Sequence, residues 1–140
     1  MSLRIRSVYM RGGTSKGLFF RDTDLPKNSA KRDTIILRCM GSPDPRQVDG
    51  LGSGFSSASK VAIITPPKKP GEHVKYLFGQ VSVNSSFVDY RGNCGNLSAA
   101  VGPFAIDEGM VEAIEPLTTV KILNQNTGKM IFAEVPVKDG

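Results

Sequence analysis

The first twenty positions alternate between hydrophobic and polar residues in a way that predicts two paired strands. Residues 3–10 (LRIRSVYM) alternate loosely with a period of two, and residues 16–21 (KGLFFR) form a second, largely apolar run. The intervening Arg11-Gly12-Gly13-Thr14-Ser15 has the composition of a turn. The segment therefore predicts a β-hairpin with a glycine-rich tip.

The pattern becomes helical after Asn28. Either Asn28 or Ser29 can cap the helix start, Gly41 follows its end, and the apolar positions lie near one another on the helix surface: Ile35, Ile36, Leu37 and Met40. These features predict a helix over residues 28–40. Residues 43–59 are rich in Gly, Ser, Pro and Asp, have no apolar period, and predict a loop.

The remainder of the chain predicts further strands and one buried helix. Strands are expected at 60–64, ended by Pro66-Pro67, and within 73–83 and 85–90. A tight turn at 92–96 leads into the small, apolar, uncharged residues 97–106, which predict a buried helix with a kink or break at Gly102-Pro103. A hairpin is expected from 118–125 and 129–137 around Asn126-Thr127-Gly128. The fold class is α+β, with antiparallel strands wrapped around a central apolar helix.

Composition excludes several classes of protein. A chain of 140 residues with 39% hydrophobic residues forms one domain or part of one, and it is too apolar to be disordered. No run approaches the length of a membrane helix and the N-terminus lacks a signal-peptide pattern, so a cytoplasmic protein is expected. Two cysteines and one histidine argue against a disulfide framework and a metal site.

The charge distribution indicates an anionic partner. Residues 1–70 contain 13 basic and 5 acidic residues, whereas residues 71–140 contain 5 basic and 8 acidic ones. The basic residues are scattered singly rather than arranged along one helix, which argues against nucleic acid. A small polyanionic metabolite needs only a few cations in a cleft and is therefore the expected partner.

Three glycine-rich segments could bring backbone N–H groups close to such an anion: 11–17 (RGGTSKG), 49–60 (DGLGSGFSSASK) and 91–96 (RGNCGN). Ordinary turns explain any one of them equally well. Cys94 is expected at a helix start, where N–H groups and the helix dipole favour a thiolate, and a glycine-rich turn offers it no core face. Lys60 begins an apolar strand, where desolvation would make it a usable base, or its amine could reach solvent instead.

Two family resemblances compete for these segments. Residues 50–58 (GLGSGFSSA) superficially resemble the phosphate loop of the small-molecule kinases that act on homoserine, mevalonate and galactose, but Gly54-Phe55 interrupts the match. MRGGTSKGLFF (10–20), DGLGSGFSSASKVAII (49–64) and GNCGNLSAAVGPFAI (92–106) together closely resemble the 2-methylaconitate cis/trans isomerase (PrpF-like) family, relatives of diaminopimelate epimerase. This resemblance accounts for all three segments, in order, across most of the chain.

The PrpF resemblance implies a fold, a reaction and a set of site residues. It implies one of two similar lobes, each a sheet wrapped around a central helix, with the active site between the lobes. It implies an isomerase that moves a C=C bond in 2-methylaconitate or a similar acid of propionate metabolism, with no metal or organic cofactor. Lys60 would be the catalytic base and Cys94 a substrate contact or acid/base thiol. The residues expected to bind substrate are Arg11, Thr14, Ser15, Lys16, Ser56, Ser57, Gly95 and Asn96.

Family members are more than twice as long as this chain. We therefore expect residues 1–140 to be the N-terminal lobe of a longer protein, inactive or nearly so without the second lobe. Exposed apolar surface on the side facing that lobe would favour self-association. A kinase and a lobe that binds carboxylates without turnover are the alternatives.

Overall fold

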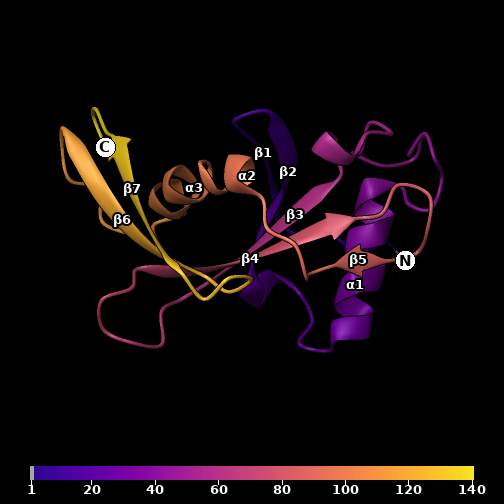
Figure 1. Cartoon of the computed structure of the whole chain (residues 1–140), viewed down its shortest axis with the longest axis horizontal. Coiled ribbons are helices and arrows are strands. Elements are labelled where there is room, and N and C mark those ends of the chain that lie inside the picture. Colours follow the sequence, from indigo (N-terminus) through magenta and orange to yellow (C-terminus); the bar gives the residue numbers. More distant parts are fainter. Residues whose placement is uncertain (1) are drawn as a thin grey trace.

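Seven strands form one sheet in the computed structural model, which describes residues 2–140 (Figure 1). The order is β1-β2-β3-β4-β6-β7, and β5 also pairs with β4. The bounds are β1 (Val8–Gly12), β2 (Ser15–Arg21), β3 (Lys60–Thr65), β4 (Val74–Val81), β5 (Val88–Asp89), β6 (Leu117–Asn124) and β7 (Met130–Pro136). Both predicted hairpins, β1–β2 and β6–β7, are confirmed.

The sheet is mixed, which corrects the antiparallel arrangement expected from the sequence. Four pairings are antiparallel, but β2 and β3 run parallel, as do β4 and β6. Parallel neighbours need a long crossover connection rather than a tight turn. Residues 22–59 connect β2 to β3 and contain one helix, whereas residues 82–116 connect β4 to β6 and contain β5 and two helices. The α+β class itself is confirmed.

The first helix, α1 (Ser29–Met40), has the ends that its sequence predicts. The side chain of Asn28 accepts a hydrogen bond from the Lys31 N–H at 3.0 Å, and Gly41 adopts φ 88°, which stops the helix in the left-handed conformation. Short 3-10 turns, η1 (Asp22–Asp24) and η2 (Ser56–Ala58), precede α1 and β3. Ile36 and Met40 of α1 are buried against one face of the sheet.

The predicted buried helix is divided into α2 (Gly95–Ser98) and α3 (Val101–Asp107). The break lies at Ala99-Ala100, one turn before the predicted Gly102-Pro103. Pro103 has no N–H to donate to the carbonyl of Ala99, so the helical ladder is interrupted there, whereas the proline itself fits the first turn of α3. Helix α2 contacts β1 and β2, and α3 contacts β6 and β7, so the sheet curves around the two helices from edge to edge.

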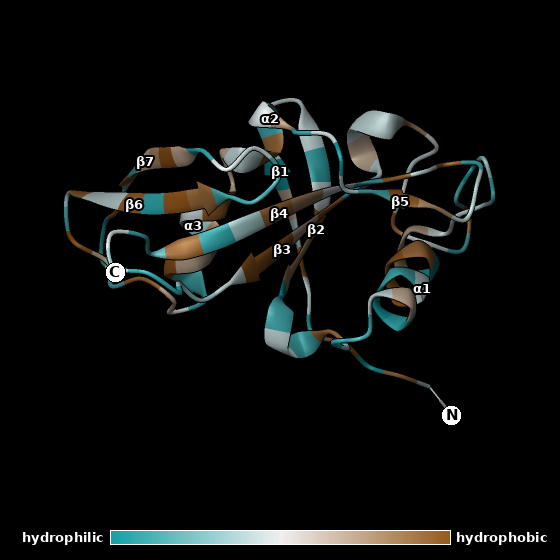
Figure 2. Cartoon of the chain, turned by 60° about the horizontal axis from the view of Figure 1, so that its bottom comes forward, coloured by the Kyte–Doolittle hydropathy of each residue, from teal (hydrophilic) through white to brown (hydrophobic). Residues whose placement is uncertain are grey.

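Two hydrophobic clusters cover the two faces of the sheet. Alternate residues of β3 belong to different clusters: Ala62 and Ile64 pack with α2 and α3, whereas Val61 and Ile63 pack with α1. Because both faces of β3 are covered, its sequence is a continuous apolar run rather than an alternating one (Figure 2). We call the face that carries α2 and α3 the inner face.

Two element boundaries differ from the sequence prediction. The first strand begins at Val8 rather than at residue 3, and residues 2–7 have no regular structure. The strand expected over 85–90 is reduced to β5, which has two residues and pairs only with the end of β4. In both segments the strand is limited by its partner: Val8 is the first residue paired with β2, and only Val88 and Asp89 pair with β4.

Candidate active site

Lys60 is the first residue of β3, and its side chain lies on the inner face. It occupies the same face as Ala62, two residues further along the strand, and only 9% of the residue is exposed. Its Nζ donates a hydrogen bond to Oε1 of Gln80 on β4 at 2.6 Å and lies 5.2 Å from the centre of the Phe78 ring. The amine is therefore held between an amide and an aromatic ring rather than directed to solvent.

Gly17 leaves the space that Lys60 needs. Gly17 on β2 pairs with Lys60, and a Cβ at position 17 would lie 2.6 Å from the Lys60 carbonyl oxygen and 3.3 Å from its Cβ. Any side chain there would collide with the lysine. Gly17 of segment 11–17 is therefore needed for the close approach of Lys60, the last residue of segment 49–60.

Cys94 caps the start of α2 with its sulfur. The N–H of Leu97 donates to Sγ at 3.3 Å, and Sγ lies 3.5 Å from Oγ of Ser15, where either group can donate. Only 8% of Cys94 is exposed, and it belongs to the inner hydrophobic cluster. The expectation that its turn has no core face is therefore wrong, because the turn lies directly over the sheet. The predicted helix-start position is confirmed.

Tyr76, on β4, lies fully buried in the same cluster as Cys94. Burial raises the pKa of its phenol, and the nearby charge of Cys94 raises it further. Within residues 2–140, the Tyr76 hydroxyl has no hydrogen-bond partner. Sequence analysis missed this residue, since a tyrosine in an apolar strand gives no signal beyond that of a core position.

The turn between β1 and β2 packs against the start of α2. A Cβ on Gly13, whose φ is +54°, would collide with the Asn96 side chain, and one on Gly12 would collide with the Asn96 carbonyl oxygen. Gly95 and Asn96 are exposed, and no acceptor in the described residues pairs with their N–H groups. Because α2 has only four residues, these N–H groups rather than a helix dipole are available to an anion.

Two of the expected cationic contacts lie elsewhere. Ser15 and Gly17 share the inner face with Phe19, so the alternation of β2 places Lys16 on the other face. Arg11 pairs with Lys16 and shares that face, and its Nε donates to the Gly13 carbonyl at 2.8 Å. The structure therefore does not bring these two side chains to Lys60 and Cys94. Thr14 is exposed at the hairpin tip.

The segment 49–60 contacts the site through a backbone carbonyl group of η2. Ser56 and Ser57 are exposed on η2, and η2 contacts β2. The Ser56 carbonyl accepts a hydrogen bond at 3.0 Å from Nε2 of Gln80, the residue that holds Lys60. Gln80 is a second residue that sequence analysis missed, because its role depends on which residue of β3 it faces.

Lys60, Cys94, the segments 11–17 and 91–96, and η2 thus lie together at one end of the inner face. The glycines of segment 49–60 lie elsewhere, because the N–H groups of Leu51 and Gly52 donate to the Cys39 and Met40 carbonyl oxygens at the end of α1. Ser15 contacts Cys94 and is two residues from Gly17, which pairs with Lys60, while Phe78 joins the ammonium to the cluster that contains the cysteine. Figure 1 shows the β1–β2 turn and α2 at the same edge of the molecule. The arrangement combines a buried amine and a buried thiol with hydroxyl groups and free N–H groups on an exposed edge.

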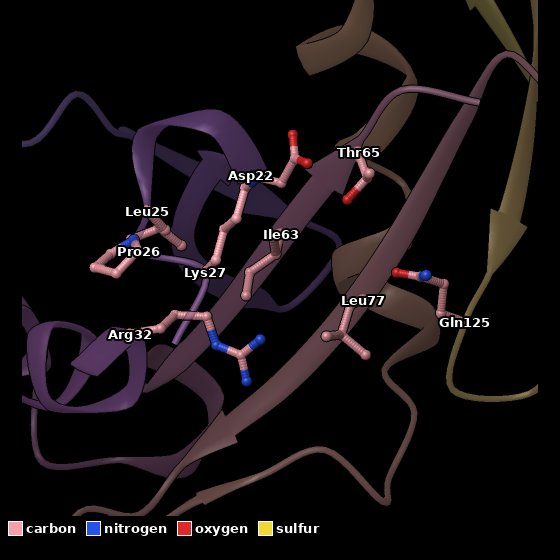
Figure 3. Close-up of a pocket in the computed structure, with 9 residues that line it drawn as sticks. All are labelled: Asp22, Leu25, Pro26, Lys27, Arg32, Ile63, Thr65, Leu77 and Gln125. Carbon is pink, nitrogen blue, oxygen red and sulfur yellow. The ribbon is translucent and has the colours of Figure 1, made fainter. Parts of the chain in front are cut away.

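A separate pocket lies on the opposite face of the sheet. It has a volume of about 300 Å³ and is lined by Ile63 and Leu77 together with residues of η1 and α1, including Arg32 (Figure 3). Neither Lys60 nor Cys94 lines it. In residues 2–140 there is no group of three or more His, Cys, Asp and Glu side chains placed to hold a metal ion. None of the helices described is long and apolar enough to cross a membrane.

Comparison with known proteins identifies the family. The sequence model described as PrpF protein matches residues 2–140. The chain belongs to the PrpF family. It is 56% identical over 138 residues to 3-methylitaconate isomerase of Eubacterium barkeri, covering 99% of this chain and 36% of the relative. It is 49% identical over 148 residues to 2-methyl-aconitate isomerase of Shewanella oneidensis, covering 99% and 37%.

Solved structures agree with the family assignment. A crystal structure of methylitaconate-delta-isomerase matches this PrpF chain with a TM-score of 0.95 and 55% identity, covering 98% of the chain and 61% of that structure. A probable proline racemase from Agrobacterium radiobacter matches with a TM-score of 0.61 at 16% identity, which shows the fold alone. The diaminopimelate epimerase-like fold is confirmed, and the kinase resemblance is not supported. The chain spans little more than a third of the length of these relatives.

Proposed function

We propose that the PrpF chain forms half of the active site of an isomerase that moves a C=C bond in a small di- or tricarboxylate. The observation that carries the proposal is the placement of the Lys60 amine, buried and held by Gln80, on the same face and at the same end as the Cys94–Ser15 pair. The named activities of the relatives, on methylitaconate and 2-methyl-aconitate, supply the reaction class.

The reaction needs only a proton carrier and groups that stabilise negative charge. Unprotonated Lys60 takes a proton from a carbon next to both the C=C bond and a carboxylate. The electron pair of the broken C–H bond spreads over the alkene and the carboxylate, giving an allylic anion. The Lys60 ammonium returns the proton to the other end of that anion, and the double bond forms at the new position. Proton and electrons balance without an oxidant or reductant.

The neighbouring groups bind the acid and stabilise the anion. The free N–H groups of Gly95 and Asn96, and the hydroxyls of Thr14, Ser56 and Ser57, lie on the exposed edge where a carboxylate would approach. Cys94 and Ser15 lie below that edge and provide a second proton-carrying pair. Arg11 and Lys16 have no part in this proposal, because their side chains lie on the other face.

A second lobe completes the site in this proposal. The hydroxyl and free N–H groups of the candidate site are exposed, and water there would compete for the carbanion. The relatives have almost two thirds of their length outside the matched region. We propose that this remainder forms the opposite wall of a cleft and supplies the missing cations.

The test uses a composite enzyme, defined as residues 1–140 of this chain followed by the remaining residues of the Eubacterium barkeri isomerase. Its turnover of 3-methylitaconate and 2-methylaconitate is followed by NMR in deuterated water. Lys60→Met should lower kcat by about 10³-fold, since a positioned base contributes roughly 10² to 10⁴. Lys75→Met is the matched control, because Lys75 is similarly buried, at 6% exposed, but lies outside the site.

Two results would overturn the proposal. The first is unchanged turnover in the Lys60 variant, which would remove the base. The second is a composite enzyme that binds the acids, seen as a rise in Tm, but neither converts them nor incorporates deuterium. That result would support a lobe that binds carboxylates without turnover.

A further inference from the structure

Gln80 fixes the Lys60 amine from the neighbouring strand. The two residues are directly paired in the β3–β4 register, and Nζ donates to Oε1 at 2.6 Å. Lys60 does not take part in any ion pair within residues 2–140. The described contacts of the ammonium are therefore a neutral carbonyl oxygen and the face of the Phe78 ring.

The orientation of the Gln80 amide is determined by its other hydrogen bonds. Nε2 donates to the carbonyl oxygens of Ser56 at 3.0 Å and Ser59 at 2.9 Å. Amide nitrogen can only donate and amide oxygen can only accept. A flipped amide would place Oε1 against the two carbonyl oxygens and would place Nε2, a donor, against the Lys60 ammonium, also a donor. Oε1 must therefore face Lys60.

A neutral acceptor suits an amine that has to change its charge. A carbonyl oxygen accepts a hydrogen bond from an ammonium and from a neutral amine, so Lys60 stays in place in both states. A carboxylate at the same position would favour the charged form and oppose the loss of the proton. Gln80 has the length of a glutamate but not its charge.

We propose that Gln80 is a positioning residue that keeps Lys60 over the Phe78 ring while its proton leaves and returns. This inference rests on the proposed function, in which Lys60 is the base. The same amide joins Lys60 to η2 through Ser56, so it also sets the distance between the base and the hydroxyl groups of the second motif. Displacing a catalytic group by about 1 Å can cost roughly 100-fold in rate.

The kinetic test compares two substitutions in the composite enzyme. Gln80→Met keeps the length and removes all three hydrogen bonds, and we expect kcat to fall by about 10- to 100-fold with KM within about twofold. Gln80→Glu keeps an acceptor for the Lys60 amine but adds a negative charge, and its kcat should be lower than that of Gln80→Met. Gln125→Met is the control, because Gln125 lines the separate pocket and should leave kcat unchanged. A kcat for Gln80→Met equal to that of the unsubstituted enzyme overturns the proposal.

A second readout does not depend on turnover. The lysine Cε groups of the 140-residue chain are labelled with ¹³C, and the Lys60 signal is assigned by its loss in Lys60→Arg. The Phe78 ring should shift this signal away from those of exposed lysines, and Gln80→Met should move it back toward them. An unmoved signal overturns the positioning role even if kcat falls. A moved signal in the 140-residue chain, together with a composite enzyme that shows no turnover, keeps the positioning role and refutes the proposed function.

Discussion

Tyr76 and Tyr90 are both substantially buried, but their hydroxyl groups have different surroundings. The Tyr90 hydroxyl donates to Oδ1 of Asp33 at 2.5 Å, whereas that of Tyr76 has no partner within residues 2–140. An unpaired buried hydroxyl costs about 1–3 kcal/mol, and a hydrogen bond to a charged group contributes a similar amount. The two tyrosines therefore make opposite predictions for the same chemical change.

We expect Tyr76→Phe to raise the free energy of unfolding of the 140-residue chain by about 1 kcal/mol, because it removes an unpaired polar group. Tyr90→Phe should lower it by about 1–2 kcal/mol, because Asp33 then keeps only its hydrogen bond from Arg32. Urea titration followed by circular dichroism measures both. A loss of stability in Tyr76→Phe would show that this hydroxyl has a partner, such as a bound water, in solution.

Individual residues differ in how far the sequence could predict their roles. Lys60 stands out in the sequence because a lysine at the start of an apolar strand is unusual. Cys94 stands out because its neighbours in sequence are glycine and asparagine rather than apolar residues. Gln80 does not stand out, because its contact with Lys60 depends on the β3–β4 register. A shift of one residue would turn its side chain to the other face. The same alternation turns the side chains of Arg11 and Lys16 to the other face of the sheet, although both residues are close to Ser15 in sequence.

At the level of elements, local sequence signals predict the structure correctly, and the relative direction of strands distant in sequence does not follow from them. The Asn28 cap, the Gly41 stop and both hairpins depend on neighbouring residues, and all are confirmed. The direction of β3 relative to β2 depends on how residues 22–59 cross the sheet, and composition contains no information about that path. Pro103 is an intermediate case: the sequence predicts a break at Gly102-Pro103, and the break lies at Ala99, whose carbonyl oxygen receives no hydrogen bond from the proline.

The contact between α3 and β7 leads to a prediction at this scale. A Cβ on Gly102 would lie 2.8 Å from Cγ2 of Val135 and 3.3 Å from Cβ of Ala133. Alanine favours a helix over glycine by about 1 kcal/mol, but overpacking costs about 1–3 kcal/mol. We therefore expect Gly102→Ala to lower the free energy of unfolding in urea titration.

Two further variants test the cause of that loss. Gly95→Ala should be neutral or stabilising, because nothing lies within 4 Å of its added Cβ. The double variant Gly102→Ala/Val135→Ala should lose less free energy of unfolding than the two single variants lose together, because the smaller side chain at position 135 leaves room for the new methyl group. Strictly additive losses would locate the effect of Gly102→Ala outside this contact.

For the molecule as a whole, the candidate site lies at one edge, and its apolar surroundings are exposed. Phe55 precedes η2 and is 71% exposed, close to Ser56 and the residues that it joins. Phe132 on the edge strand β7 is similarly exposed, at 64%, but lies at the opposite end of the sheet. If a second lobe covers the site, the surface around Phe55 is apolar because it is buried in the longer protein, and the 140-residue chain should self-associate through it.

This reasoning predicts which substitution prevents self-association. Burying a phenylalanine contributes about 1.5–3 kcal/mol, and each 1.4 kcal/mol corresponds to a tenfold change in affinity. Phe55→Ser should therefore weaken dimerisation of the 140-residue chain at least about tenfold in sedimentation equilibrium, whereas Phe132→Ser should leave it unchanged. In the composite enzyme the second lobe occupies this surface, so Phe55→Ser should lower Tm there without changing oligomeric state. A chain that stays monomeric at every concentration, or one that responds only to Phe132→Ser, would contradict a covered edge at the site.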